Sequence, residues 1–116
     1  MIGSVEEWRD DGETSRERPI APLHLHRSED EAWYVLEGAL GFKAGQEEIH
    51  ADAGQSVIVP ARTPHSYWNA TAGLTRYVIV MGPQTAALVA AIHAMDPFDR
   101  ARLPALFEEH DSELFV

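Results

Sequence analysis

Between Ile20 and Val80 the chain is a succession of short stretches rich in Val, Ile, Tyr and Trp, punctuated by glycines and prolines. Such spacing of strand-forming runs and turn residues is typical of an all-β sandwich or barrel. At Glu37-Gly38 and Ala44-Gly45 a glycine lies where a tight hairpin turn needs a residue that tolerates a positive φ. We therefore predict strands near residues 20–26, 31–37, 39–44, 46–50, 55–60, 65–69 and 74–80.

The segment before this pattern, residues 1–18, is polar and charged. It predicts either a mobile N-terminal arm or an edge segment that needs a partner. We expect regular structure to begin around Pro19, so that residues 19–82 form the barrel.

The residue composition changes after Gly82-Pro83, where the alanine- and leucine-containing run QTAALVAAIHAM has helical propensity. Asp96-Pro97 predicts the N-cap and first turn of a second helix, and Pro104 predicts a break or restart of that helix. We expect residues 83–116 to form two short helices that pack on the barrel edge or build a dimer contact.

Composition narrows the classes of partner. Nine Lys and Arg residues stand against nineteen Asp and Glu residues, which gives a formal net charge of -10. A negative net charge repels phosphates and anionic lipid, so we expect no nucleic-acid or membrane partner. The acidic residues occur in short groups such as Glu29-Asp30 and Glu108-Glu109, and we interpret them as a solvated surface.

Cysteine usage and targeting signals narrow the chemistry and the compartment. The chain contains no cysteine. A disulfide framework, an iron–sulfur cluster and a thiol nucleophile are therefore excluded, and any metal must be held by nitrogen and oxygen. The N-terminus lacks the charge and apolar pattern of a signal peptide, and no segment approaches the roughly 18 apolar residues of a spanning helix. We expect a soluble, cytoplasmic protein.

The stretch HLHRSEDE places His24 and His26 one residue apart and Glu31 five positions later. Successive side chains of a strand alternate between its faces, so both histidines point the same way and reach one ion. A turn through residues 27–30 is expected to bring Glu31 to the neighbouring strand of a β-hairpin. His65 follows an apolar strand and a short loop, and supplies the fourth ligand.

These residues resemble the two motifs of the cupin superfamily, specifically of its small single-domain members. The first motif, G-x5-HxH-x(3,4)-E-x6-G, matches His24, His26, Glu31 and Gly38. The second, G-x5-PxG-x2-H-x3-N, matches Gly54, Pro60, His65 and Asn69. The resemblance covers roughly residues 18–80.

Two positions depart from the motifs. Arg18 stands in place of the leading glycine of the first, and Arg62 in place of the inner glycine of the second. Glycine permits backbone angles that arginine adopts only with strain, so Arg62 is expected to alter the loop that presents His65. It also adds a charge near the barrel mouth.

The resemblance implies a double-stranded β-helix, or jelly-roll, barrel that encloses one divalent metal ion held by three histidines and one glutamate. Imidazole and carboxylate ligands suit Fe, Mn, Ni, Cu or Zn alike. One or two positions on the ion stay open for substrate or dioxygen. The resemblance also implies a homodimer, in which the N-terminal arm and the apolar end ELFV are ordered by the partner.

The alternation of side chains between the two faces of a strand predicts further pocket residues. If Glu31 faces inward, Trp33 does so as well, and if His65 faces inward, Tyr67 and Asn69 do so as well. Trp33 and Tyr67 are candidates for the pocket wall or for plain core packing. Arg76 is either a clamp for a substrate carboxylate or a surface charge, and we favour the surface. The remaining histidines, His50, His93 and His110, are interpreted as structural or surface residues.

Three functions fit this site. The first is a metal-dependent dioxygenase that acts on a small enol, diketone or aromatic substrate, in which Glu31 also acts as a base. The second is a metal-dependent isomerase, cyclase or decarboxylase that uses the ion as a Lewis acid. The third is a cupin that binds a small ligand without turnover.

Overall fold

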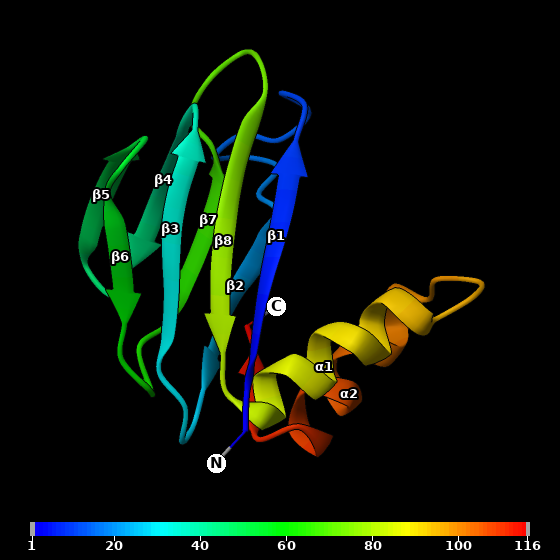
Figure 1. The fold of residues 1–116 in the computed structure, drawn as a ribbon. Coiled ribbons are helices and arrows are strands. Elements are labelled where there is room, and N and C mark those ends of the chain that lie inside the picture. Colours follow the sequence, from blue (N-terminus) through cyan, green and yellow to red (C-terminus); the bar gives the residue numbers. More distant parts are fainter. Residues whose placement is uncertain (1, 116) are drawn as a thin grey trace.

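The computed structural model describes residues 2–115, which form two antiparallel sheets that face each other, with two helices at one side (Figure 1). The strand order is β1-β8-β3-β6 in one sheet and β5-β4-β7-β2-β9 in the other. The prediction of a jelly-roll sandwich with short C-terminal helices is confirmed. The strands are β1 (Ser4–Asp10), β2 (Ala21–His26), β3 (Glu31–Glu37), β4 (Ala39–Ala44), β5 (Glu47–Asp52), β6 (Ser56–Val59), β7 (His65–Asn69), β8 (Thr75–Met81) and β9 (Ser112–Leu114).

The core lies between the sheets, because alternate residues of each strand point inward. Strand β3 shows the pattern directly, with Trp33 and Val35 buried while Tyr34 between them is exposed. From the opposite sheet, Leu40 and Phe42 of β4 are fully buried. Trp33 packs against Phe42 and Tyr67 with ring centroids 5.0 Å and 5.3 Å apart. Aromatic residues therefore fill the middle of the sandwich.

The strand nearest the N-terminus corrects one expectation. Regular structure begins at Ser4 rather than near Pro19, because β1 pairs with β8 along its whole length, from Ser4 opposite Met81 to Asp10 opposite Thr75. A sheet edge supplies backbone hydrogen bonds whatever the side chains are, so a polar segment can pair there. Trp8 packs its indole on the core, and the partner of this edge segment is the chain's own β8.

The C-terminal end also pairs within the chain. Strand β9 adds to the edge of the second sheet by pairing with β2, with His24 opposite Leu114 and His26 opposite Ser112. The sequence pattern did not predict this three-residue strand. Within residues 2–115, both terminal segments therefore pair inside one chain. Val116, the last residue of the predicted apolar end, lies outside the described residues.

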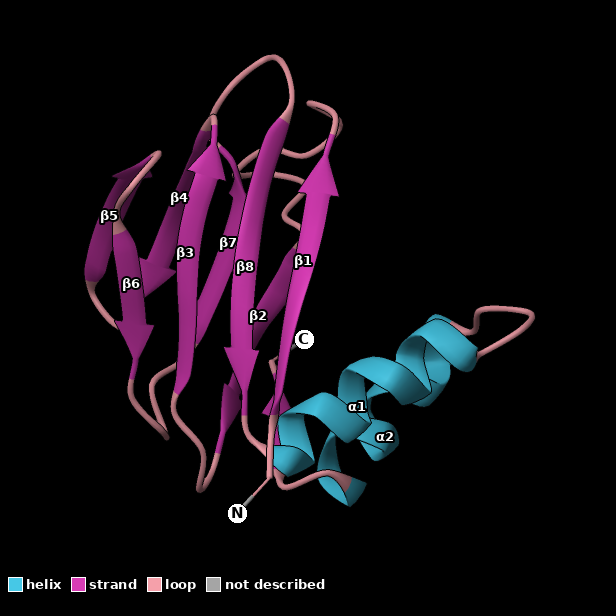
Figure 2. Ribbon diagram, in the orientation of Figure 1, coloured by secondary structure: helices cyan, strands magenta, loops and turns pink. Residues whose placement is uncertain are grey.

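Two helices and one short 3₁₀ turn follow the barrel strands: α1 (Pro83–Ala94), η1 (Arg100–Arg102) and α2 (Leu103–Glu109) (Figure 2). The predicted N-cap at Asp96 is wrong, because the N-cap of α2 is Arg102. Asp99 caps the preceding turn η1, and its side chain accepts a hydrogen bond from the amide of Ala101 at 3.1 Å. Pro104 lies in the first turn of α2, where no amide donor is needed, so the predicted restart is confirmed. Within residues 2–115 no helix is long and apolar enough to cross a membrane.

The two predicted glycine turns differ in kind. Gly45 has a φ of 59° and closes the β4–β5 hairpin as expected. Gly38 also has a positive φ, 80°, but β3 and β4 belong to different sheets, so it forms a corner between them and not a hairpin. A Cβ atom at Gly38 would lie 2.3 Å from the hydroxyl oxygen of Thr75, which leaves room for glycine alone.

Candidate metal centre

Four side chains that can bind a metal ion meet inside the sandwich. One ligand atom from each of His24, His26, Glu31 and His65 lies within 4.8 Å of all the others, and all four residues are buried. Two ligands on opposite sides of one ion, each at roughly 2.0–2.2 Å, are about 4 Å apart. The cluster is therefore close in size to a filled site, and it is consistent with one metal ion.

The ligands reach this point from both sheets, which corrects the expected hairpin. His24 of β2 lies directly opposite His65 of β7 in the second sheet. Glu31 is the first residue of β3, which belongs to the first sheet. Residues 27–30 are therefore a crossover from one sheet to the other. The carboxylate faces the three imidazoles across the interior, instead of standing beside them on a paired strand.

Hydrogen bonds at Nδ1 fix the orientation of all three imidazoles. Nδ1 of His24 lies 2.6 Å from the carbonyl oxygen of Pro22, and Nδ1 of His65 lies 2.9 Å from that of Thr63. A carbonyl only accepts, so these nitrogens carry the proton. Nδ1 of His26 lies 2.7 Å from the hydroxyl of Ser112, which donates its own proton to the carbonyl of His110 at 3.0 Å and so accepts from the imidazole.

In the neutral form of the imidazoles, these bonds leave the Nε2 lone pairs for the cluster. Nε2 of His65 lies 3.2 Å from Oε1 of Glu31, and Nε2 of His26 lies 3.1 Å from the same oxygen yet makes no hydrogen bond. Lone pairs and a carboxylate oxygen repel one another at this distance. The arrangement calls for a positive charge among them, either protons on the imidazoles or one divalent cation, so the residues fit a metal ion.

Two of the four ligands have shifted pKa values. Burial raises the pKa of Glu31, but the close approach and positive charge of His26 and His65 outweigh burial and lower it to about 2. Burial, followed by the charges of His65 and His26, lowers the pKa of His24 to about 3. At neutral pH the cluster therefore offers an ionised carboxylate and a neutral imidazole, which are the forms that bind metal.

A cavity of about 770 Å³ opens on this cluster. His24, His26 and Glu31 lie in its wall. The rest of the wall is mostly apolar or aromatic, and it includes these residues of the inner sheet faces and of α1 and α2: Tyr67, Tyr77, Ile79, Met81, Leu88, Val89, Ile92, Leu103 and Phe107. Charged side chains also line it, from the segment before β2 and from η1: Glu13, Glu17, Arg18 and Arg100. Phe107 of α2 covers His24, with ring centroids 5.6 Å apart. The two helices therefore close one side of the cavity.

Comparison with known proteins decides the family. A family model described as "Cupin domain" matches residues 16–81, which is more than half of the chain. The chain is a cupin. No curated protein matches it at a significant level.

Solved structures resemble this cupin over part of its length. The protein TT1209 from Thermus thermophilus is 30% identical, with a TM-score of 0.51 over 54% of this chain and 60% of the other. A sugar phosphate isomerase of the cupin superfamily from Silicibacter pomeroyi is 26% identical, with a TM-score of 0.55 over 66% and 48%. A protein with a double-stranded β-helix domain from Klebsiella pneumoniae is 21% identical, with a TM-score of 0.58 over 72% and 70%. The chain thus spans only 60% of the Thermus protein and about half of the Silicibacter isomerase.

The aromatic pocket candidates of this cupin are both buried, as alternation predicts, but they lie differently. Tyr67 lines the cavity. Trp33 is not part of its wall, and packs behind His65 with ring centroids 5.8 Å apart. The hydroxyl groups of Tyr67 and Tyr77 lie 3.0 Å apart. Burial and the neighbouring tyrosine raise the pKa of Tyr67 well above its ordinary value, and burial raises that of Tyr77 to about 12.

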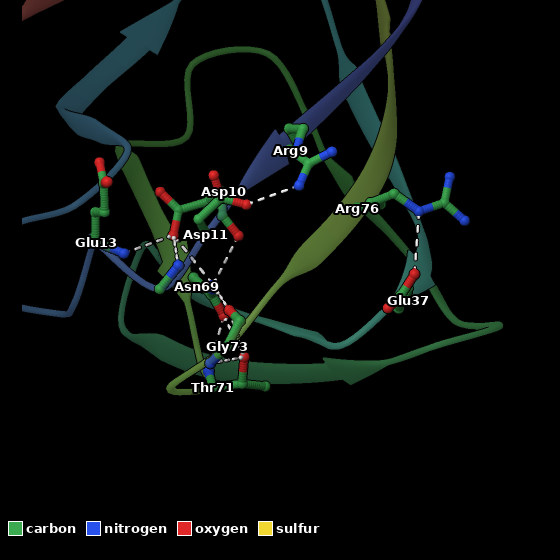
Figure 3. A network of polar contacts seen from close by, with 10 residues as sticks. Arg9, Asp10, Asp11, Glu13, Glu37, Asn69, Thr71, Gly73 and Arg76 are labelled. Atoms are coloured by element: carbon green, nitrogen blue, oxygen red, sulfur yellow. Dashed lines mark hydrogen bonds and ion pairs between the residues drawn. The ribbon is translucent and has the colours of Figure 1, made fainter.

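Asn69, also a pocket candidate, lies outside the cavity wall and holds the opposite end of the sandwich together (Figure 3). Its amide nitrogen donates to the side chain and carbonyl of Asp10 and to the carbonyl of Gly73, at 2.7–3.2 Å. Its amide oxygen accepts from the hydroxyls of Thr71 and Thr75, both at 2.8 Å. The motif asparagine therefore ties β1 and the β7–β8 loop to the sandwich.

Arg76 lies on the outer face of the first sheet, away from the cavity. Its guanidinium group binds Glu37 at 3.1 Å and Glu7 at 2.9 Å, which are surface ion pairs (Figure 3 shows the first). These carboxylates raise the pKa of Arg76. The structure thus places Arg76 on the surface, the alternative that the sequence favoured over a carboxylate clamp.

Two buried polar residues escaped the sequence analysis. Ser112 orients His26, but a lone serine near a chain end gives no signal in a sequence. Glu29 was interpreted as part of the solvated surface, and this is wrong. Its carboxylate is buried and accepts hydrogen bonds from the amides of Gln84 and Thr85 at the start of α1, at 2.9 Å and 2.8 Å. A negative charge at a helix N-terminus is favourable, and this contact ties α1 to the crossover between His26 and Glu31.

The loop before His65 accommodates arginine at the expected glycine position. Arg62 has a φ of 67°, which is in the left-handed region that favours glycine. Its amide donates to the carbonyl of His26 at 2.7 Å, and the neighbouring amide of Ala61 donates to Asp30 at 2.8 Å. These bonds hold the loop in place beside the ligand strands.

Proposed function

We propose that this cupin is a metal-dependent dioxygenase that acts on a small enol, diketone or aromatic substrate. The supporting observation is that the three-histidine, one-glutamate cluster opens on a cavity whose wall is mostly apolar and aromatic. A planar, largely apolar molecule with one or two oxygen atoms fits such a surface.

Each ligand has a defined role in this proposal. His24, His26 and His65 would hold the ion through Nε2, since Nδ1 of each is bound elsewhere. Glu31 would hold it through its carboxylate. When bound, a redox-active ion such as Fe, Mn, Ni or Cu supplies the electron transfer that reactions with dioxygen require.

Glu31 is also proposed as the base that accepts the proton of an enol or phenol. Its low pKa depends on contact with His26 and His65, whereas burial alone raises it. If substrate binding moves the carboxylate away from these partners, its pKa rises and its oxygen becomes able to hold a proton. The proton would then rest on the carboxylate, at the cavity wall.

A second candidate is a metal-dependent isomerase, cyclase or decarboxylase. The observation that favours it is the 26% identity to a sugar phosphate isomerase of the cupin superfamily. In such a reaction the ion acts as a Lewis acid that stabilises an enolate, and oxygen takes no part. The same four ligands serve both candidates, so the two are separated by their need for oxygen.

The first test measures the metal content of protein purified without chelator or histidine tag, by elemental mass spectrometry. His65→Ala is the variant that should lose the ion, and His50→Ala is the matched control because His50 is exposed and lies outside the cluster. We expect near-stoichiometric metal in the wild type and in the control. Absence of metal even after reconstitution would refute the metal centre.

The second test follows oxygen uptake by protein loaded with Fe, Mn, Ni or Cu, in the presence of flavonols, diketones and catechols. Uptake that is lost in His65→Ala supports the dioxygenase. Turnover that persists without oxygen, or with zinc as the only metal, supports the isomerase group instead. Saturable binding with no product in any form would favour a ligand-binding cupin.

A further inference from the structure

Two tyrosines meet across the interior of the sandwich and face the cavity. Tyr67 comes from β7 and Tyr77 from β8, so they belong to opposite sheets. Their hydroxyl oxygens lie 3.0 Å apart, and the two residues are 7% and 3% exposed. Both residues line the same cavity as His24, His26 and Glu31.

This pair has one hydrogen-bond donor more than the protein can satisfy. Each phenol carries one proton, and only one of the two can lie in the bond between the oxygens. Within residues 2–115 neither hydroxyl has another partner. The nearby indole nitrogen of Trp33 also lacks a partner, and it is a donor as well. The indole cannot accept a proton, so whichever phenol donates to the other, the second phenol proton has no protein acceptor among the described residues.

A buried donor without an acceptor is costly, and a ligand that supplies an acceptor relieves this cost. The pair is close to the metal ligands: Tyr67 follows His65 by two residues on the same face of β7, a rise of roughly 6.6 Å along the strand. A molecule the size of one aromatic ring that touches the cluster would extend as far as the tyrosines.

We propose that the Tyr67–Tyr77 pair donates one hydrogen bond to an acceptor oxygen of the substrate, and so selects molecules that carry a carbonyl or similar oxygen beyond the group that faces the metal ligands. The proposal rests on the proposed function, because it takes the metal cluster as the place where the substrate is anchored. It narrows the substrate class to planar molecules with oxygen atoms at both ends.

The test compares two probes on protein loaded with zinc, which is redox-inert and leaves the probes intact. Catechol carries only the chelating hydroxyl pair, whereas 3,4-dihydroxybenzaldehyde adds a carbonyl oxygen. Their affinities are measured by titration calorimetry for the wild type, Tyr67→Phe, Tyr77→Phe and the double variant. Tyr34→Phe is the matched control, because Tyr34 is exposed on the outer face of the first sheet.

We expect the double variant to bind the aldehyde about 10-fold more weakly than the wild type, with catechol affinity and zinc content unchanged. One single variant, the one that removes the donating hydroxyl, should show most of this loss. Equal aldehyde affinity in the wild type, the double variant and the control would overturn the proposal while leaving the metal centre intact. Failure of the zinc-loaded wild type to bind either probe would refute the proposed substrate class, and this inference with it.

Discussion

Replacing Ser112 by alanine tests whether the metal centre depends on a residue that no motif identifies. The hydroxyl of Ser112 accepts the Nδ1 proton of His26 at 2.7 Å and donates to the carbonyl of His110 at 3.0 Å, and the residue is fully buried. Without it, the Nδ1 proton has no acceptor. The imidazole then gains by rotating or by moving the proton to Nε2, the nitrogen that faces the cluster.

The expected magnitude follows from this contact. Loss of a partner that orients a metal-binding histidine typically lowers metal affinity 10- to 100-fold, which corresponds to about 1.4–2.7 kcal/mol. We expect Ser112→Ala to fall in this range for Zn(II). The free energy of unfolding of the metal-free protein should fall by about 1–3 kcal/mol, because a buried donor is left unpaired.

Competition with a chromophoric chelator at neutral pH measures the affinity, and urea denaturation measures the stability. Ser56→Ala is the matched control, since Ser56 is exposed on β6. Ser112→Thr keeps the hydroxyl and should restore most of the affinity. Zinc affinity of Ser112→Ala within about twofold of the wild type would show that the hydrogen bond does not orient His26.

Four further outcomes are expected. Glu29→Ala should lower the free energy of unfolding by about 2–3 kcal/mol in urea, because it removes a charged acceptor from the start of α1, while Glu109→Ala, an exposed control, should not. Arg62→Gly should raise the free energy of unfolding by up to about 1 kcal/mol by relieving the positive φ, and a lower melting temperature would contradict this. The metal-free protein should lose stability as the pH falls, because folding lowers the pKa of His24 to about 3 and that of Glu31 to about 2, so that the unfolded chain binds protons first. The loss runs from about pH 6.5 to 3 for His24 and from about pH 4.5 to 2 for Glu31. A melting temperature that stays constant between pH 7 and 5 would contradict this prediction. The protein is expected to be a homodimer, and sedimentation that shows only a 12.9 kDa species would refute that expectation.

The strands and the four ligands were predictable because both depend on local patterns. Turn residues and alternation place seven strands to within about two residues, and three of them, β3, β4 and β7, coincide with the prediction. The missed strands, β1 and β9, are held by backbone hydrogen bonds to strands far away in the sequence. Such pairing depends on which sheet edge is free, and that is decided only when the whole sandwich forms.

The position of each pocket candidate was less predictable, because alternation gives the face of a strand but not the depth along it. Tyr67 and Asn69 share a face of β7, yet one lines the cavity and the other binds Asp10 at the opposite end. The same limit applied to the link from His26 to Glu31. A hairpin and a crossover both fit four intervening residues, and only the sheet order separates them.

The crossover explains why those four residues are charged or polar although they lie between buried ligands. Arg27 pairs with Glu108 of α2 at 2.9 Å, Glu29 holds the start of α1, and Asp30 holds the loop that leads to His65. The segment that spaces two metal ligands therefore also fastens both helices and the loop of a third ligand. Since α1 and α2 form one side of the cavity, the spacing of the ligands and the closure of the cavity depend on the same short stretch of chain.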